Sequence, residues 1–297
     1  MDTSLIDDLL SKYSQVVIYG AKGWLGRSAL KTLEIKPHHY SSVLLIGSRE
    51  ESVRHTGLPL DVYSAERALD KVRKGSMFFN AAFLRREKIQ ELGETEFILR
   101  NEIISNFPYQ LLKRQFISSF INLSSGVAKQ EGNNLDIYAR LKYESKLHLT
   151  KLTSENGSQL VNCQIFTISG EFINEFSNLA LSNFIMQALN STNEIVIKSP
   201  NAKRTYIDAV NLSEVLLKLT LDKVDIDIDS GGINVNFLQL AEIIRNSLSP
   251  NKKLKLLDEP GADYFGDFEK FNQIAKLKKV ELLDLNQQIN LTVRAFN

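Results

Sequence analysis

The feature that most constrains this chain is a set of three glycines placed directly after a short apolar run. The run Val16–Tyr19 is mostly β-branched, and Gly20, Gly23 and Gly26 follow it at three-residue steps before a helical pattern begins. In this setting the first glycine permits a tight turn, the second lets a pyrophosphate approach the backbone, and the third lets helix and strand pack closely. The helix N-terminus then offers free N–H groups to phosphates. The stretch predicts a dinucleotide-binding unit, the alternative being a glycine-rich turn without a ligand. The residues expected at the cofactor are Gly20, Lys22, Gly23, Trp24, Leu25 and Gly26.

Apolar runs alternate with helical patterns over the first 170 residues. The runs are continuously apolar, which is typical of parallel strands buried on both faces. Alternation of this kind predicts an α/β fold with a doubly wound, Rossmann-like parallel sheet. The expected strands are Val16–Tyr19, Val43–Ile46, Met77–Asn80, Phe116–Leu123 and Leu160–Ile168, and the expected helices are Leu25–Leu33, Ser64–Val72, Glu94–Lys113 and Asp136–Thr153.

The pattern changes after Gly170, where helical stretches become longer and strand-like pieces shorter. We therefore expect a dinucleotide-binding domain over residues 1–170 and a smaller, mostly helical substrate-binding lobe over 171–297, with some elements returning to the sheet. The expected helices of this lobe are Glu175–Leu189, Asn211–Leu221, Phe237–Leu248 and Phe268–Lys278, with a short strand at Glu194–Lys198.

Composition excludes several classes of function. Lys and Arg number 36 against 35 Asp and Glu, so a net charge of +1 gives no electrostatic reason to expect binding to nucleic acid or to an anionic membrane. No apolar run approaches the roughly 20 residues that span a bilayer, and the acidic start is unlike a signal peptide. The single Cys163 cannot form an intrachain disulfide, and four scattered histidines predict no metal site. We expect a cytoplasmic protein.

The residues after the second strand predict which dinucleotide binds. An NAD site usually has an acid there for the ribose 2′-hydroxyl, but this chain has Gly47 followed by Ser48 and Arg49. A hydroxyl and a guanidinium suit a 2′-phosphate, and Lys22 can add charge to the same end. The prediction is NADP(H), with NAD possible; the alternative is that Arg49 only pairs with a neighbouring glutamate. A further pair, Asp61 and Val62, is expected near the adenine.

Downstream residues provide a candidate catalytic group. The strand Phe116–Leu123 is followed by Ser124 and Ser125, and a helical pattern then carries Tyr138 and Lys142. Residues four apart share one helix face, so the ammonium lies beside the phenol and lowers its pKa from about 10. Such a tyrosine can exchange the proton of an alcohol/ketone pair while hydride moves to or from a cofactor. The hydroxyl of Ser125 can hold the same oxygen.

Together these segments resemble an extended short-chain dehydrogenase/reductase of the NAD-dependent epimerase/dehydratase family, which modifies nucleotide sugars. The resemblance covers most of the chain. It is carried by YGAKGWLG, FFNAAF, FILRNEIISN, INLSSG, YARLK and KRTYIDAVNLSEVLLKL. It implies cofactor contacts from Ala81, Ala82, Phe83, Asn101, Tyr138 and Lys142, and substrate contacts from Ser124, Ser125, Thr167 and Arg204.

Arg204 matches an arginine that often contacts the nucleotide diphosphate in this family, the alternative being a surface salt bridge. Departures from the family pattern narrow the expected reaction. Family dehydratases carry Asp-Glu after the catalytic serine or threonine, whereas Gly126 and Val127 stand here, so a dehydratase is disfavoured.

We expect an NADP(H)-dependent reductase that acts on C4 of a nucleotide-linked keto-sugar. The alternatives are an epimerase with tightly bound NAD and a non-catalytic dinucleotide-binding regulatory protein. The family also implies a homodimer through the helices Glu94–Lys113 and Asp136–Thr153; alternatively, these helices only cover the sheet.

Overall fold

The computed structural model describes residues 4–55, 57–129, 136–174 and 179–296. The chain divides into two compact units, which are described separately. Unit 1 consists of Met1–Gln164 and Ser213–Ile228, and unit 2 of Ile165–Leu212 and Asp229–Asn297. The first unit therefore ends at residue 164 and not at the expected 170, and residues 213–228 belong to it as well.

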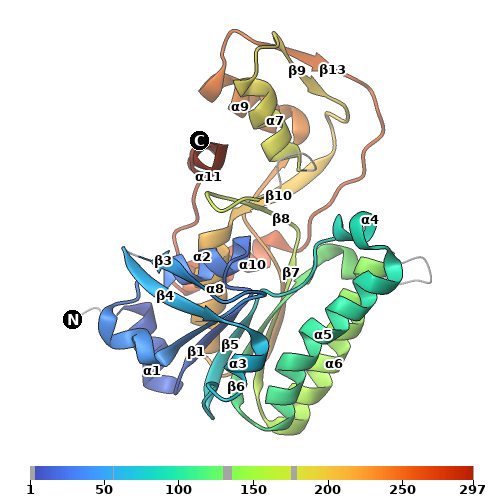
Figure 1. Ribbon diagram of the computed structural model, residues 1–297. Helices are drawn as coiled ribbons and strands as arrows, with labels where there is room; N and C mark the ends of the chain where they lie inside the picture. The colour runs from blue at the N-terminus through green and yellow to red at the C-terminus, as the bar shows by residue number, and fades with distance from the viewer. Residues whose placement is uncertain (1–3, 56, 130–135, 175–178, 297) are drawn as a thin grey trace. The chain divides into compact units, whose positions relative to one another are not determined.

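Unit 1 is built around a large, mostly parallel sheet, which confirms the expected fold class (Figure 1). Among the described residues the sheet has eight strands in the order β11-β7-β6-β5-β1-β2-β4-β3. Strand β1 pairs in parallel with β2 on one side and with β5 on the other, so the strand order reverses at β1. In such sheets ligands bind at the carboxyl ends of the strands beside this reversal. The strands are β1 Val16–Tyr19, β2 Val43–Ile46, β3 Glu51–His55, β4 Leu58–Tyr63, β5 Ser76–Asn80, β6 Ile117–Ser125, β7 Gln159–Ile165 and β11 Ile226–Asp229.

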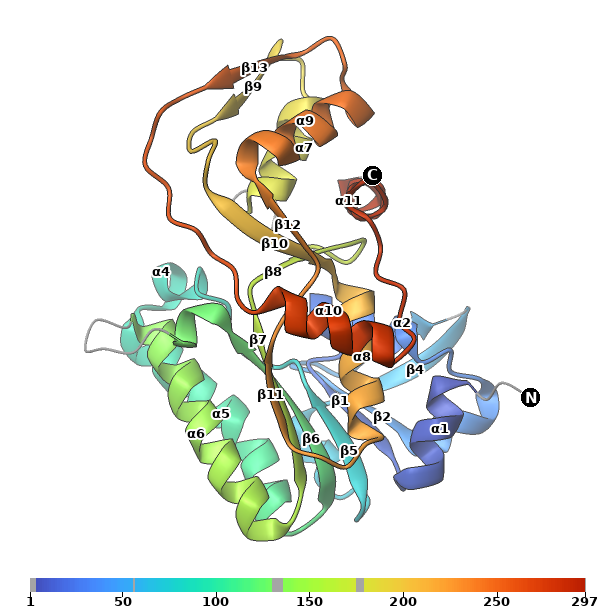
Figure 2. The ribbon, with the colours of Figure 1, turned by 180° about the vertical axis from the view of Figure 1, so that it is seen from behind.

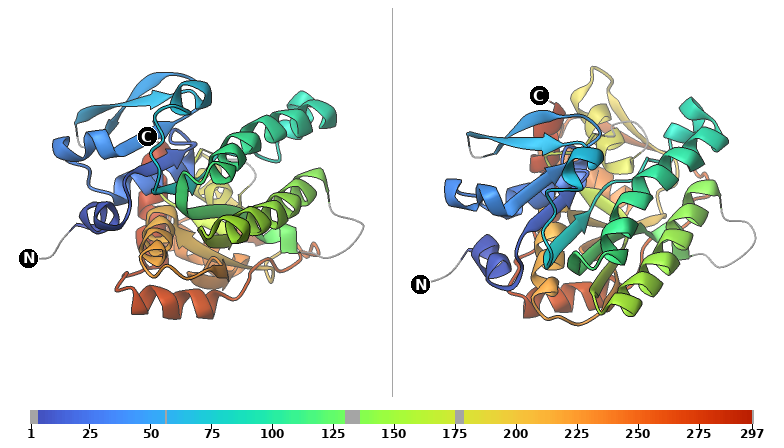
Figure 3. Two further views of the ribbon diagram at one scale, coloured as in Figure 1. Left: turned by 90° about the horizontal axis from the view of Figure 1, so that it is seen from below. Right: turned by 60° about the horizontal axis from the view of Figure 1, so that its bottom comes forward.

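Helices cover both faces of this sheet. Helices α5 and α6 lie side by side on one face (Figures 1 and 3), and the part of α8 that belongs to unit 1 lies on the other (Figure 2). The helices of the unit are α1 Leu5–Lys12, α2 Trp24–Thr32, α3 Ala65–Ala68, α4 Lys88–Leu92, α5 Glu94–Lys113, α6 Ile137–Asn156 and the end of α8 (Ala209–Thr220), with 3-10 turns at Pro37–Ser42 and Gly126–Lys129.

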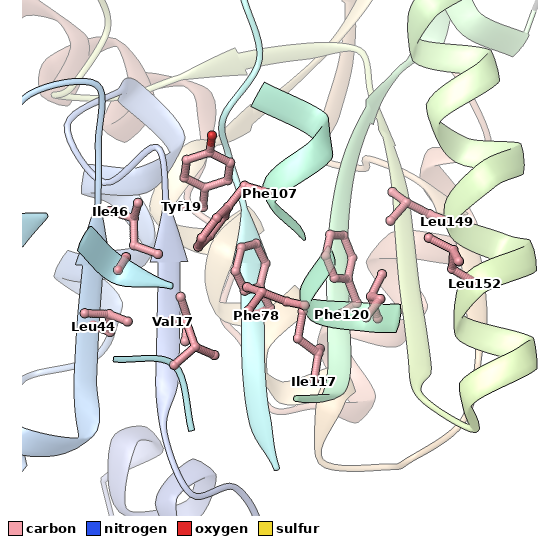
Figure 4. Packing of buried hydrophobic residues seen from close by; sticks show 14 of the residues in the cluster. Val17, Tyr19, Leu44, Ile46, Phe78, Phe107, Ile117, Phe120, Leu149 and Leu152 are labelled. Atoms are coloured by element: carbon pink, nitrogen blue, oxygen red, sulfur yellow. The ribbon is translucent and has the colours of Figure 1, made fainter. Parts of the chain in front are cut away.

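The core beneath α5 and α6 has a group of aromatic rings at its centre, surrounded by aliphatic side chains (Figure 4). Phe78 of β5 and Phe120 of β6 stack with ring centroids 5.3 Å apart, and Tyr19 of β1 lies 5.3 Å from Phe107 of α5. Burying each such side chain contributes about 1.5–3 kcal/mol. This packing fixes α5 and α6 on the strands that carry the candidate site.

Three expected elements differ substantially from the structure, whereas the bounds of the others agree to within three residues. The expected helix Ser64–Val72 is helical only over Ala65–Ala68, because the next amides form turns, with Lys71 N–H donating to the Ala68 carbonyl. The expected strand Leu160–Ile168 is broken at Phe166, whose N–H donates to Ser230 Oγ as the chain passes to a second sheet. The expected helix Glu175–Leu189 begins at Ala180, and residues 175–178 lie outside the described residues.

Unit 2 contains more strand than the sequence indicates. Its described strands form one sheet in the order β12-β10-β8 and a second sheet that pairs β13 with β9. Its core is formed by Leu181 and Ile185 of α7, the strand residues Ile195 and Tyr206, and Leu240 of α9. The elements are β8 Thr167–Ser169, α7 Ala180–Leu189, β9 Glu194–Ile197, β10 Lys203–Asp208, β12 Ile233–Asn236, α9 Phe237–Leu248, β13 Lys253–Leu256, α10 Phe268–Leu277, α11 Leu285–Val293 and a 3-10 turn at Arg294–Phe296.

Within the described residues, no helix has the length and apolar character needed to cross a bilayer.

Candidate active site

The glycine turn lies at the carboxyl end of β1, where the strand order reverses. Gly20 has φ +83°, and a Cβ there would lie 2.7 Å from the carbonyl carbon of Ala81, which follows β5. A Cβ on Gly26 would lie 2.2 Å from the Gly20 carbonyl oxygen. Gly23 is the N-cap of α2, and its N–H donates to the Gly20 carbonyl at 3.0 Å. Two of the three glycines are therefore required by direct backbone contact.

The start of α2 fits a bound diphosphate. The first N–H groups of a helix have no partner within it, and the N-cap Gly23 has no side chain to accept from them. Trp24, the first residue of α2, has a buried indole N–H without a hydrogen-bond partner in the described structure. Unused donors at a helix N-terminus favour an anion. Trp24 and Leu25 are both partly exposed.

The end of β2 carries charges in an arrangement that the sequence did not indicate. Lys22 forms an ion pair with Glu51 at the start of β3, with Nζ and Oε1 2.5 Å apart. Glu50 pairs with Arg67 at 2.5 Å. Both glutamates that were candidate partners for Arg49 are therefore paired with other cations, while Ser48 and Arg49 are exposed.

Gly47 is a poor position for an acid. A Cβ there would lie 2.9 Å from Val62 Cγ1 and 3.3 Å from Lys22 Cδ, so a longer side chain displaces Val62. Val62 is buried in β4, which pairs in parallel with β2. Asp61, expected near the adenine, is exposed and accepts a hydrogen bond from Ser52 Oγ of β3 at 3.0 Å.

The loop after β5 is held by Asn101 of α5. The Asn101 side chain is 2% exposed, accepts from the Leu84 N–H at 2.9 Å and donates to the Phe97 carbonyl at 3.0 Å. At the start of the loop, the Ala81 N–H donates to the Tyr19 carbonyl at 2.8 Å. Ala81, Ala82 and Phe83 are thus fixed between β1 and α5.

Tyr138 and Lys142 lie one turn apart near the start of α6. Asp136 caps this helix by accepting from the Ala139 N–H at 2.8 Å. Lys142 Nζ donates to the Leu123 carbonyl of β6 at 2.8 Å and lies 4.0 Å from the ring centroid of Phe83. The Phe83 ring also meets the Tyr138 ring edge to face, with centroids 5.8 Å apart. Burial lowers the pKa of Lys142 to about 7.

Ser124 and Ser125 end strand β6, directly after the carbonyl that accepts from Lys142. Ser124 is 4% exposed, and its Oγ is buried without a hydrogen-bond partner in the described structure. Ser125 is 9% exposed. A buried hydroxyl left without a partner costs free energy, so Ser124 Oγ is a candidate to bind a ligand.

A second contact holds α6 on the sheet, one turn after Lys142. Lys146 Nζ lies 2.5 Å from Asp227 Oδ2 of β11. The other oxygen of Asp227 accepts from Asn162 Nδ2 at 2.8 Å and from Gln164 Nε2 at 2.7 Å. Burial alone would raise the pKa of Asp227, but these hydrogen bonds and the Lys146 charge outweigh it and lower the pKa. The helix that carries Tyr138 is therefore bound to β6 and β11 at successive turns.

Thr167 and Arg204 lie in unit 2. Thr167 is buried in β8, which pairs with β10 in parallel. Arg204 of β10 donates through Nη1 to the carbonyls of Lys203 and Ala262, at 2.8 and 2.6 Å. Its guanidinium also lies over the rings of Phe237 and Tyr264, 5.0 and 5.7 Å from their centroids.

Two of the four histidines lie close to an aspartate, although the sequence predicted no metal site. Asp7, His38 and His39 bring three possible metal-ligand atoms within 4.8 Å of one another. His39 Nδ1, however, accepts from the Lys36 N–H at 3.1 Å, and its Nε2 donates to Asp7 at 2.9 Å. Both ring nitrogens are used in holding a turn, so the group does not fit a metal ion.

Sequence reasoning missed Glu51 and the Leu123 carbonyl. Glu51 stands five residues after the end of β2, and the only available signal was an acid close to Arg49. The Leu123 carbonyl had no signal, because its contact with Lys142 depends on how α6 packs on β6.

Solved structures with a similar fold cover nearly the whole of this chain. A UDP-N-acetylglucosamine 4-epimerase from Methanobrevibacter ruminantium M1, in complex with UDP-N-acetylmuramic acid, is 19% identical over 96% of this chain and 98% of its own, with a TM-score of 0.72. A UDP-glucuronic acid 4-epimerase from Bacillus cereus, with UDP-glucuronic acid and NAD, is 12% identical over 95% of this chain and 98% of its own, with a TM-score of 0.70.

A dTDP-glucose 4,6-dehydratase double mutant from Streptomyces venezuelae, with NAD bound, is 13% identical over 95% of this chain and 96% of its own, with a TM-score of 0.70. At these identities the likeness establishes the fold. No curated protein sequence matches significantly. The model of one enzyme family matches residues 16–229, which is most of the chain, and the chain therefore belongs to the NAD dependent epimerase/dehydratase family.

Proposed function

We propose that this protein moves hydride between a sugar carbon of a nucleotide-linked sugar and a nicotinamide dinucleotide, with Tyr138 as the proton-transfer residue. One observation carries the proposal: Tyr138 and Lys142 lie one turn apart on α6, and Lys142 is held at the carboxyl end of β6, directly before Ser124. The glycine turn at the end of β1 supports a dinucleotide beside them.

The chain's own residues supply proton transfer and orientation. The phenol of Tyr138 gives a proton to the carbonyl oxygen on reduction and takes it from the hydroxyl on oxidation. Below its pKa of about 7 Lys142 is charged and favours the phenolate. Ser125 holds the reacting oxygen, and Ser124 adds a second hydroxyl at the same strand end. When bound, the nicotinamide supplies or accepts the hydride.

The first candidate reaction is NADP(H)-dependent reduction of a nucleotide-linked keto-sugar at C4. Arg49 supports NADP(H), because it is exposed while Glu50 and Glu51 pair with Arg67 and Lys22. A guanidinium is well suited to a 2′-phosphate. A reductase must exchange its cofactor after every turnover, which agrees with an open, charged 2′ end.

The second candidate is epimerisation with tightly bound NAD. It is favoured by Glu51, a carboxylate near the end of β2 that can accept from a ribose hydroxyl. The similar solved structures from Methanobrevibacter ruminantium and Bacillus cereus are also named as 4-epimerases. A purely regulatory dinucleotide-binding protein has no need of Ser125, Tyr138 and Lys142, and their presence argues against it.

For the nucleotide-sugar substrate, we assign Thr167 and Arg204 as contacts in unit 2, with Arg204 at the diphosphate. Nη1 of Arg204 is used by two backbone carbonyls, but a guanidinium has further donors for an anion. We also propose a homodimer through α5 and α6, because Leu99, Ile103 and Leu147 on these helices are about half exposed or more. The mass of the purified protein in solution tests the dimer.

The deciding experiment has two steps. The purified protein is denatured and any released dinucleotide is identified, and NADPH and NADH are then titrated using the fluorescence of Trp24, the only tryptophan. Reversible binding that prefers NADPH supports the reductase, whereas stoichiometric NAD carried through purification supports the epimerase. In the second step, Tyr138→Phe should lower turnover at least 100-fold and keep cofactor affinity within about twofold, given typical general acid–base effects. Turnover retained in this variant would overturn the mechanism.

A further inference from the structure

Phe83 contacts both members of the candidate catalytic pair. Its ring centroid lies 4.0 Å from Lys142 Nζ and 5.8 Å from the Tyr138 ring, which it meets edge to face. Lys142 Nζ also donates to the Leu123 carbonyl. The ammonium thus contacts both a backbone acceptor on β6 and an aromatic face from the loop after β5.

The position of Phe83 is fixed by its own loop. The next residue, Leu84, donates its N–H to the buried Asn101 side chain at 2.9 Å, and Asn101 is in turn bound to the Phe97 carbonyl. A side chain whose loop is tied down in this way keeps its geometry relative to α6. Asn101 therefore acts on the pair through Phe83.

We infer that Phe83 is a positioning residue whose ring covers the Lys142 ammonium and holds Lys142 and Tyr138 in register for proton transfer. The inference rests on the proposed function, since it assigns a role to Tyr138 and Lys142. The inference goes beyond the proposed function in one respect: it assigns control of the pKa of Lys142 to an aromatic ring and not to a charged neighbour.

The charged groups on the elements packed around Lys142 are largely paired elsewhere. On α6, Lys146 pairs with Asp227, and Asp136 before the helix pairs with Arg86. On β6, Lys142 Nζ contacts the Leu123 carbonyl, and the next residue, Ser124, is neutral. In the loop after β5, Lys142 Nζ contacts the ring of Phe83. Burial is accordingly the cause of the lowered pKa of Lys142.

The ring has two opposing effects on the lysine. Its face attracts a cation and so favours the charged form, whereas its bulk excludes water and disfavours it. Because burial lowers the pKa of Lys142, we expect exclusion of water to be the larger of the ring's two effects. Phe83→Ala admits water and should raise the pKa. Phe83→Leu keeps an apolar cover but loses the aromatic face, and should lower it further.

The test measures Lys142 directly and needs no substrate. The full-length protein is acylated with a lysine-reactive reagent over a range of pH, and labelling of the peptide containing Lys142 is measured by mass spectrometry. Labelling should have a midpoint near pH 7 in the unaltered protein. The midpoint should rise by about one pH unit in Phe83→Ala, fall in Phe83→Leu, and stay in place in Phe83→Tyr, which keeps the ring.

Asn101→Ala should move the midpoint in the same direction as Phe83→Ala, but less. Phe265→Ala is the matched control, because it removes a partly exposed aromatic ring from unit 2 and should move nothing. Equal midpoints in Phe83→Ala and the unaltered protein, with circular dichroism showing folded protein, would overturn the inference. If Phe83→Ala does not fold, an unmoved midpoint in Phe83→Leu overturns it equally.

A failure of this inference can be told apart from a failure of the proposed function. If Tyr138→Phe retained turnover, the proposed mechanism would fail, yet the labelling shift would still show whether Phe83 controls Lys142.

Discussion

The two ends of the candidate dinucleotide site are built by different means. At the glycine turn, contacts between backbone atoms determine the geometry, as where Gly26 approaches the Gly20 carbonyl. At the 2′ end, beside β2, the deciding groups are side-chain charges: Lys22, Arg49 and Glu51. A site made from backbone tolerates almost no change, whereas a site made from charges can be retuned one residue at a time.

The same difference explains what a sequence can reveal. Glycines at fixed steps after a strand indicate backbone approach directly, because few other reasons require them there. A charge indicates nothing until its partner is known, and the partner of Lys22 lies on a hairpin, β3–β4, that the apolar pattern did not show.

The largest effect should come from Gly26→Ala. The new methyl would lie 2.2 Å from the Gly20 carbonyl oxygen, so the turn must open or the helix must move. We expect a loss of about 3 kcal/mol or more in the free energy of unfolding, as for overpacking against immobile atoms. Cofactor binding should fall below detection. Urea unfolding and Trp24 fluorescence measure the two effects.

Gly23→Ala is the matched control for this prediction. Its Cβ would lie 3.3 Å from the Gly20 carbonyl oxygen, a contact that a small shift relieves. An equal loss of unfolding free energy in both variants would mean that the close approach at Gly26 is not responsible, since alanine is otherwise the better helix former within α2.

An intermediate effect should appear at the charged end, as a change in cofactor preference. Arg49→Ala should lower the affinity for NADPH about tenfold relative to that for NADH. A tenfold change corresponds to about 1.4 kcal/mol, which is typical of one charge-assisted contact to a phosphate. Glu51→Gln should raise the affinity for NADPH relative to that for NADH. The change frees Lys22 from its ion pair and removes a negative charge from the 2′ end of the site. Titration of each variant with both cofactors checks this. If Arg49→Ala lowered the affinities for NADPH and NADH by the same factor, Arg49 would not bind a 2′-phosphate.

The smallest effect should come from the contact that anchors α6 after Lys142. Asp227 is about half exposed, so Asp227→Asn should cost under about 1 kcal/mol at pH 7. The folded-state pKa of Asp227 is lowered, so its carboxylate stabilises the fold above the unfolded pKa of about 3.9 and loses that effect as the pH falls through the folded value. The difference between variant and unaltered protein in urea unfolding should therefore shrink between pH 7 and pH 3. A difference that grew at pH 3 would contradict the assignment.

Much of the fold was predictable because its central strands are apolar on both faces. Val16–Tyr19 and Val43–Ile46 were predicted with the bounds that the structure shows, as were the helices Glu94–Lys113 and Phe237–Leu248. Edge strands were missed for a physical reason: Ile226–Asp229 alternates apolar and acidic residues, as a strand covered on one side does.

The candidate site was predictable where its residues share one element. Tyr138 and Lys142 are one helical turn apart, so their proximity follows from spacing alone. The contacts of Lys142 with Phe83 and with the Leu123 carbonyl join three elements, and no spacing along the chain encodes them. The family resemblance did reach beyond spacing, and the match of the family model over residues 16–229 confirms it.

The return of residues 213–228 to unit 1 has a consequence for the order in which the chain is made. Strand β7 leaves the ribosome long before the residues that complete it. Three of its groups donate hydrogen bonds to residues that are synthesised later. The Gln159 side chain donates to the Val224 carbonyl, the Leu160 N–H to Asp225, and the Asn162 side chain to Asp227. A nascent chain that stops near residue 170 presents these unpaired groups on an open sheet edge, where other strands can bind. Synthesis must pass residue 228 before the sheet of the first unit can be completed.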